Sequence, residues 1–182
     1  MTMITFDHES VRCLECDEHH VFPPELLLYT SAETGKKPSY RDWNWATVLT
    51  NRIWCFQCEG PSYTERIPSQ REFDLAFKFR SDPDLPRPDN LEDELLDIDD
   101  EQFHFLRKYL KVRHQKNSCI CCGSESVRFL QTAMNRVVNF KHPLCGGILQ
   151  FDRFFFLNGS GKKTIRWFSI QGEFVGQQND YF

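Results

Sequence analysis

Apolar and polar residues alternate most regularly between Ser69 and Arg80. From Phe73 onward every second position is apolar, and these positions are Phe73, Leu75, Phe77 and Phe79. Successive side chains of a strand point to opposite faces, so a period of two predicts a half-buried β-strand.

A helical period follows between Asp99 and Lys116, where Phe103, Leu106 and Leu110 recur at intervals of three and four. Acidic residues open this segment and basic residues close it, which the helix dipole favours. We expect an amphipathic helix that packs on a sheet. Shorter helical segments are expected over 90–97 and, after two prolines, over 25–29.

The carboxy-terminal third predicts strands over 126–132, 136–141, 148–157 and 164–171. We expect the last two strands to form a hairpin, because residues 158–163 (Asn-Gly-Ser-Gly-Lys-Lys) have the composition of a turn. Its many phenylalanines fit a sheet core, although some could serve as stacking platforms for bases. The predicted fold class is α+β, with antiparallel sheets and one amphipathic helix on a Phe-rich sheet.

Potential metal ligands occur as four pairs of identical spacing. The pairs are Cys13 and Cys16, Cys55 and Cys58, Cys119 and Cys122, and His142 and Cys145. Such spacing is typical of tetrahedral zinc sites. The third and fourth pairs are separated by the usual interval for one site, so we expect them to share a zinc ion. The first two pairs would then form a second site around an insertion, unless His19 or His20 replaces a cysteine there.

Glycines after Cys122 and Cys145 suit the tight turn that such a pair needs. The remaining thiol, Cys121, is surplus and is expected to be a free thiol or one that lies next to a ligand. The alternative is that all these cysteines are separate buried thiols and that His142 is an ordinary histidine at a strand end.

These pairs resemble the zinc-ribbon family, in which two such turns lie at the ends of a small antiparallel sheet. The resemblance covers about thirty residues at the two carboxy-terminal pairs, whereas the amino-terminal pairs look like a second ribbon interrupted by an insertion. It implies two structural zinc ions. Because ribbons bind nucleic acid, bind proteins or only stabilise a fold, the motif identifies the metal and leaves the activity open.

The segment 13–59 also weakly resembles HNH endonucleases, which place a His-His dyad and an Asn between two cysteine pairs. The parallels are His19, His20 and Asn51. His19 follows Cys16 closely, and Glu59 stands where a metal-binding histidine usually follows the second pair. Both departures argue against nuclease activity.

Acidic residues are concentrated between Asp82 and Glu101, although the net charge of the chain is only −4. Three prolines in this stretch suggest a connector. We therefore expect an amino-terminal ribbon unit at 1–81, an acidic connector at 82–101, and a helix with the second ribbon at 102–182. No apolar run is long enough to span a membrane and no signal-peptide pattern opens the chain, so a cytoplasmic location is expected.

The sequence favours a non-enzymatic interaction protein, such as an adaptor, inhibitor or immunity-type protein, that docks a basic partner. The acidic residues proposed to contact it are Glu92, Asp93, Glu94 and Asp97, because such clusters steer association with basic surfaces. They could instead be a solvated face. The rival interpretation is a nucleic-acid-binding ribbon that uses Lys162, Lys163 and Arg166. The oligomeric state is left open.

Overall fold

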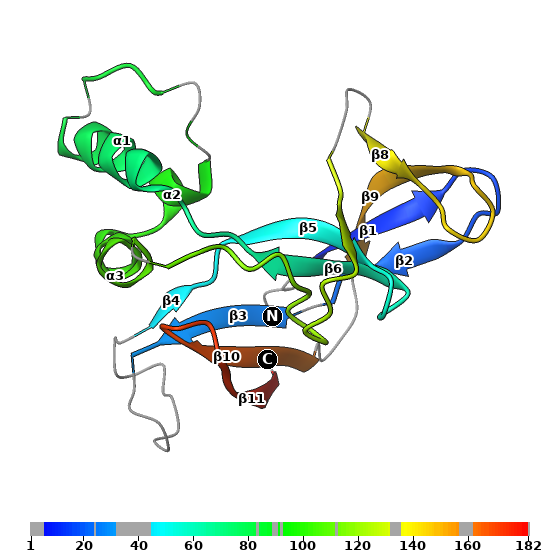
Figure 1. The fold of residues 1–182 in the computed structure, drawn as a ribbon. Coiled ribbons are helices and arrows are strands. Elements are labelled where there is room, and N and C mark those ends of the chain that lie inside the picture. Colours follow the sequence, from blue (N-terminus) through cyan, green and yellow to red (C-terminus); the bar gives the residue numbers. More distant parts are fainter. Residues whose placement is uncertain are drawn as a thin grey trace, which may run out of the picture.

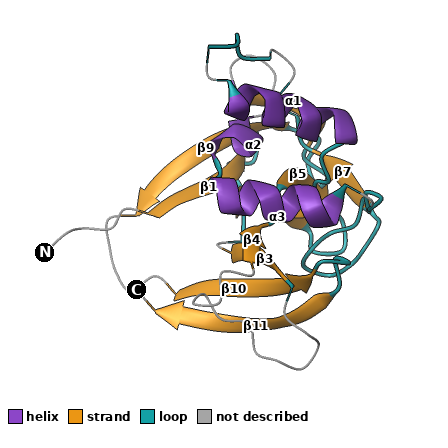
Figure 2. Ribbon diagram, turned by 90° about the vertical axis from the view of Figure 1, so that its left-hand side faces the viewer, coloured by secondary structure: helices purple, strands orange, loops and turns teal. Residues whose placement is uncertain are grey.

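The computed structural model describes residues 6–23, 25–31, 45–82, 84–88, 91, 93–111, 113–131, 136–156 and 162–181. Within these ranges the chain forms three sheets and three helices, which confirms the α+β class (Figures 1 and 2). The helices lie together on one side of the molecule, away from the sheet that contains β8 and β9 (Figure 1).

The first sheet has the order β2-β1-β9-β8 and is antiparallel throughout. Its centre joins segments far apart in the sequence, because β1 pairs with β9 along its whole length, from Phe6 opposite Phe156 to Cys13 opposite Leu149. Its strands are β1 (Phe6–Cys13), β2 (His19–Val21), β8 (Val137–Lys141) and β9 (Ile148–Phe156).

The second sheet has the order β11-β10-β3-β4. Its strands are β3 (Glu25–Thr30), β4 (Trp45–Thr47), β10 (Lys162–Ser169) and β11 (Phe174–Tyr181). The short helix expected over 25–29 is wrong, since β3 runs parallel to β10 there and Leu27, Leu28 and Tyr29 are all buried. Burial between packed layers overrides the helix-start signal of the preceding prolines.

The third sheet has the order β6-β5-β7, with β5 (Thr50–Cys55), β6 (Gly60–Glu65) and β7 (Val127–Phe129). Strand β5 is central and pairs antiparallel with both neighbours. The strands expected near 126–132 and 136–141 are present as β7 and β8, although they belong to different sheets.

Residues 70–81 form a helix, α1 (Gln70–Ser81), so the strand predicted over 69–80 is wrong. Ser69 accepts a hydrogen bond from the backbone N–H of Glu72, and the Glu72 carboxylate accepts one from the backbone N–H of Ser69. This reciprocal cap starts a helix. Phe73 and Ala76 then bury one face, while Phe77 lies at the surface beneath the Arg107 guanidinium.

The predicted amphipathic helix is confirmed as α3 (Asp100–Leu110), capped by the Asp99 side chain. Its apolar face, Phe103, Leu106 and Leu110, is buried in a cluster that includes Tyr29 and Ala46 of the second sheet. The helical turn expected before it is α2 (Asp93–Asp97).

Arg80 of α1 ties these helices together, because its guanidinium donates to the carbonyls of Leu95, Leu96 and Ile98 and to the carboxylate of Asp100. These carbonyls lie at the end of α2, where the helix itself leaves them unsatisfied.

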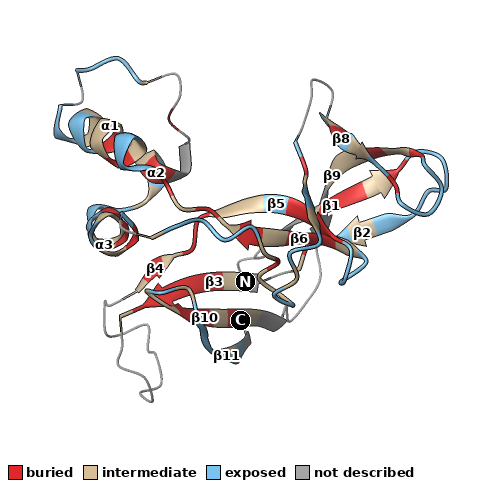
Figure 3. Cartoon of the chain, viewed as in Figure 1, coloured by how far each residue is buried: buried red, intermediate tan, exposed pale blue. Residues whose placement is uncertain are grey.

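Strand pairings cross the segment 82–101, where the sequence predicts a connector. Each sheet combines strands from both sides of that segment, through β1 with β9, β3 with β10 and β5 with β7. The expected hairpin between 148–157 and 164–171 is also wrong, since β9 and β10 lie in different sheets. Buried residues follow the strands through all three sheets (Figure 3). Among the described residues, no helix is long and apolar enough to cross a membrane.

Candidate metal centres

Site 1 consists of Cys13, Cys16, His142 and Cys145. The first two residues lie in the turn between β1 and β2, and the last two lie in the turn between β8 and β9. Because β1 and β9 are antiparallel neighbours, the end of β1 adjoins the beginning of β9, and both turns meet at one end of the sheet.

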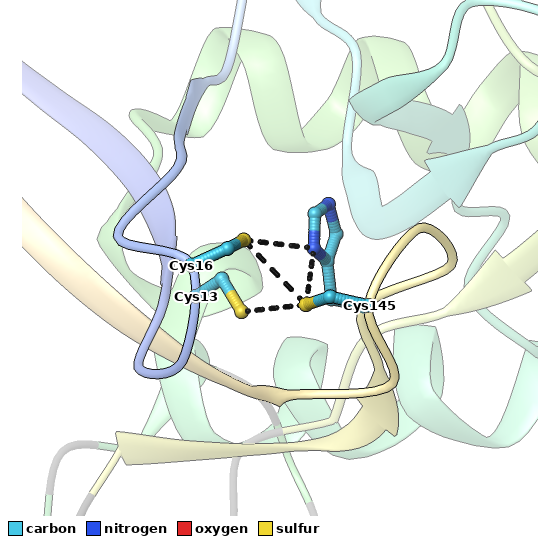
Figure 4. A group of neighbouring side chains, drawn as sticks. Cys13, Cys16 and Cys145 are labelled. Carbon is cyan, nitrogen blue, oxygen red and sulfur yellow. Dashed lines mark hydrogen bonds between the residues drawn. The ribbon is translucent and has the colours of Figure 1, made fainter.

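The ligand atoms of site 1 converge on a common point (Figure 4). The Cys145 Sγ lies 3.4 Å from Cys13 Sγ, 3.5 Å from Cys16 Sγ and 3.1 Å from His142 Nδ1. Tetrahedral zinc gives edges of about 3.8 Å between sulfurs and about 3.6 Å between sulfur and nitrogen. The cluster is slightly tighter than that ideal, and its sulfurs are too far apart for disulfides, whose bond is about 2.05 Å.

Site 2 consists of Cys55, Cys58, Cys119 and Cys122. Cys55 and Cys58 lie in the turn between β5 and β6, and the other two lie in the turn that precedes β7. The Sγ atoms of Cys55 and Cys122 are 3.6 Å apart, and those of Cys58 and Cys119 are 3.9 Å apart. These lengths match the tetrahedral edge of about 3.8 Å for four thiolates around zinc.

All eight expected ligands are therefore in the two clusters, but their expected pairing is wrong. Pairs one and four form site 1, and pairs two and three form site 2. Cys16 and His142 are 126 positions apart, and Cys58 and Cys119 are 61 apart. The partners are chosen by the strand pairings β1–β9 and β5–β7, which local spacing does not reveal.

The four turns share one backbone conformation. The residue four positions after each first ligand has a positive φ, and these residues are Asp17 (59°), Glu59 (54°), Gly123 (75°) and Gly146 (72°). In three turns its N–H donates to the carbonyl of the first ligand, as Gly123 does to Cys119 at 2.8 Å. The expected glycine turns are confirmed, and the other two turns hold non-glycine residues in the same left-handed region.

Cys121, the surplus thiol, lies beside site 2. The Ser62 hydroxyl is 3.3 Å from both the Cys119 and the Cys121 Sγ. Hydrogen bonds from Cys121 and Ser62 lower the pKa of Cys119 to about 3, which favours the thiolate that a metal requires. Burial raises the pKa of Cys58, so the full set of thiolates needs the charge of a bound cation.

The other ring nitrogen of His142 faces away from site 1. Its Nε2 lies 3.2 Å from His20 Nε2 and 3.5 Å from Glu18 Oε2. The Trp54 ring borders both imidazoles, with centroid distances of 4.9 Å to His20 and 5.9 Å to His142. Burial lowers the pKa of His20, so this side chain is neutral at pH 7. The sequence reasoning missed this group, because His20 and Glu18 have no recognisable spacing to His142.

The residues that parallel the His-His dyad and the Asn of HNH endonucleases do not lie together at one site. His20 lies against site 1, His19 is exposed on β2, and Asn51 lies on β5 at the wall of a separate cavity of about 630 Å³. None of the three belongs to site 2, although two of its ligands supply the second cysteine pair of that resemblance.

The residues expected to contact a partner are described only in part. Asp97 is exposed at the end of α2, whereas Glu92 and the side chains of Asp93 and Glu94 lie outside the described residues. Among the alternative nucleic-acid contacts, the side chains of Lys162 and Lys163 also lie outside them. Arg166 is half-buried, with Nη1 3.5 Å from the Cys121 carbonyl oxygen.

Comparisons with known protein families, with curated proteins and with solved structures find no match to this chain. The chemistry of the two ligand sets is therefore the strongest indication of what the protein binds. Both sets fit a tetrahedral ion with soft ligands.

Proposed function

We propose that this protein is a non-enzymatic binding module whose fold is held together by two structural zinc ions. The observation that supports this most is the presence of two complete four-ligand sets, which are nested in the sequence because the first and fourth pairs enclose the second and third. Seven thiols and one imidazole supply every position of two tetrahedral ions, which leaves no position for a catalytic water at either site.

Zinc suits these sites better than other common ions. Thiolate and imidazole ligands exclude magnesium and calcium, which prefer oxygen. Structural zinc binds zinc-finger peptides with apparent free energies of about 10–16 kcal/mol, whereas whole domains are stable by only about 5–15 kcal/mol. The two ions would therefore dominate the stability of the fold. None of the eight cysteines is in a disulfide, which fits a reducing compartment such as the cytoplasm.

We further propose that the partner is a basic protein that docks at the acidic end of the helical layer. Asp97, Asp99, Asp100 and Glu101 are exposed there, and Glu92, Asp93 and Glu94 precede them in the sequence. Of these four acids, only Asp100 forms an ion pair with another described residue, and its partner is Arg80. Exposed acids of this kind accelerate encounter with basic surfaces.

Two experiments test the proposal. Elemental analysis of protein purified without added metal should find two zinc ions per chain, and chelation should unfold it. A partner captured from the native host should then associate more slowly with a variant in which Glu92, Asp93, Glu94 and Asp97 are replaced by the corresponding amides.

The matched control replaces four exposed acids elsewhere, Glu15, Glu59, Glu125 and Glu173, by glutamine and should associate at the wild-type rate. If the two variants associate with the partner at the same rate, the acidic segment is only a solvated face. Sub-micromolar binding of DNA or RNA at physiological salt, weakened by Lys162→Ala with Lys163→Ala, would favour the nucleic-acid-binding alternative instead.

A further inference from the structure

We propose that Glu18, His20 and His142 form a third metal site, which takes a divalent cation of the zinc type and shares the His142 imidazole with site 1. The three residues come from the two turns and the strand that surround site 1. Glu18 and His20 belong to the β1–β2 hairpin, and His142 belongs to the turn between β8 and β9.

The geometry of the three ligand atoms carries the proposal. His20 Nε2 and His142 Nε2 are 3.2 Å apart, His142 Nε2 and Glu18 Oε2 are 3.5 Å apart, and His20 Nε2 and Glu18 Oε1 are 3.8 Å apart. Nitrogen and oxygen ligands at zinc distances span a tetrahedral edge of about 3.4 Å. The Glu18 carboxylate faces each imidazole nitrogen with a different oxygen, so a cation held between the three side chains would meet both nitrogens and the carboxylate at such edge lengths.

Hydrogen bonding among the three side chains accounts less well for this arrangement. Ordinary N–H···O bonds are about 2.7–3.2 Å long, and both distances from Glu18 to the imidazoles exceed that range. Only the contact between the two rings is short enough. A cation at the centre would satisfy all three atoms together.

His142 is placed to bridge two ions. Its Nδ1 lies 3.1 Å from Cys145 Sγ and 3.4 Å from Cys16 Sγ, whereas its Nε2 faces Glu18 and His20. When the third ion binds, it replaces the proton on Nε2, and that proton passes to solvent. A dication with three thiolates gives site 1 a charge of −1, and Glu18 adds another −1, so the surroundings favour a second cation.

The site is also accessible and incomplete in a way that suggests ligand exchange. The Glu18 side chain is 45% exposed, whereas the His142 side chain is fully buried. Two imidazoles and one carboxylate leave one tetrahedral position for water or an external ligand, as in zinc sites that are not purely structural. This goes beyond the proposed function, which requires only sites 1 and 2.

The test counts metal ions on the whole protein already loaded with two zinc ions. Dialysis against buffered Zn²⁺ followed by elemental analysis should find a third ion in the wild type and only two in His20→Ala and in Glu18→Gln. His19→Ala is the matched control, because His19 is the exposed neighbour on the same strand, and it should keep three. Added Co²⁺ should give weak visible bands without thiolate charge-transfer absorption.

Three results would overturn the proposal. The first is a wild type that binds only two ions at any tested zinc concentration. The second is a third ion that both variants retain, which would place it elsewhere. The third is loss of the site 1 zinc in Glu18→Gln, since Glu18 would then only support His142 as a ligand of site 1.

Discussion

Glu59 allows a test of the conformation that the four metal-binding turns share, because it occupies the position that glycine occupies in two of the other turns. Its φ is 54°, and its side chain is exposed. A left-handed conformation costs an L-residue about 1–2 kcal/mol, and glycine avoids this cost. Glycine also increases the conformational entropy of the unfolded chain, which lowers the stability of the folded protein by about 0.4–1 kcal/mol. Glu59→Gly should therefore raise the free energy of unfolding by about 0.5–1 kcal/mol.

The reverse change is available at Gly123, where φ is 75° and an added Cβ would meet no atom within 4 Å. Gly123→Ala should lower the free energy of unfolding by about 0.5–1 kcal/mol, for conformational reasons alone. Glu59→Ala is the control, since it removes the side chain but keeps the strained backbone, and it should be nearly neutral.

Urea unfolding at a fixed, buffered zinc concentration measures these changes, because stability depends on free metal. Circular dichroism can follow the transition, and sites 1 and 2 should stay filled in every variant. If Glu59→Gly destabilises the protein, or if Glu59→Ala stabilises it as much as glycine does, then the backbone conformation is not the cause and the reasoning fails.

Three further predictions concern the metal sites, the absence of nuclease activity and the core. Cys145→Ser should reduce the zinc count to one and lower stability by several kcal/mol, whereas Cys121→Ser should keep two ions; equal counts in both variants would contradict the ligand assignment. The wild type should leave plasmid and RNA intact with Mg²⁺, Mn²⁺ or Ni²⁺, and cleavage that disappears in His20→Ala would refute this. Burial and the nearby Glu65 carboxylate raise the pKa of Tyr29 above its usual 10.0. The neutral Tyr29 side chain therefore contributes its full stability below pH 10, and this contribution is lost as the pH rises above that value. Tyr29→Phe should flatten the fall in the free energy of unfolding between pH 9 and 11, and an unchanged slope would contradict this prediction.

The sequence predicts the ligands well because each pair carries its own local signal. In all four turns the residue four positions after the first ligand has a positive φ, as Gly123 does after Cys119. Which two pairs share a metal site is not visible in the local sequence. It depends on β1 lying beside β9 and β5 beside β7, and such long-range pairings leave no trace in local spacing.

The error over residues 69–80 has a local origin instead. The alternation of Phe73, Leu75, Phe77 and Phe79 resembles a strand, yet the capping box of Ser69 and Glu72 starts a helix that buries Phe73 and Ala76. Ser69 followed three residues later by Glu72 is a capping-box pattern in the sequence, whereas the alternation considered alone predicts a strand. By contrast, the helix at 100–110 was predictable because its period, its acidic start and its basic end all agree.

We propose that the two zinc ions are held by nested pairs, with the imidazole in the same ligand set as Cys13 and Cys16. X-ray absorption at the zinc edge of Cys13→Ser with Cys16→Ser, purified without added metal, tests it most directly. That variant should retain one zinc ion surrounded by four sulfurs, because site 2 is intact. A retained zinc with three sulfurs and one imidazole nitrogen would contradict the account, since it would place His142 with Cys119 and Cys122.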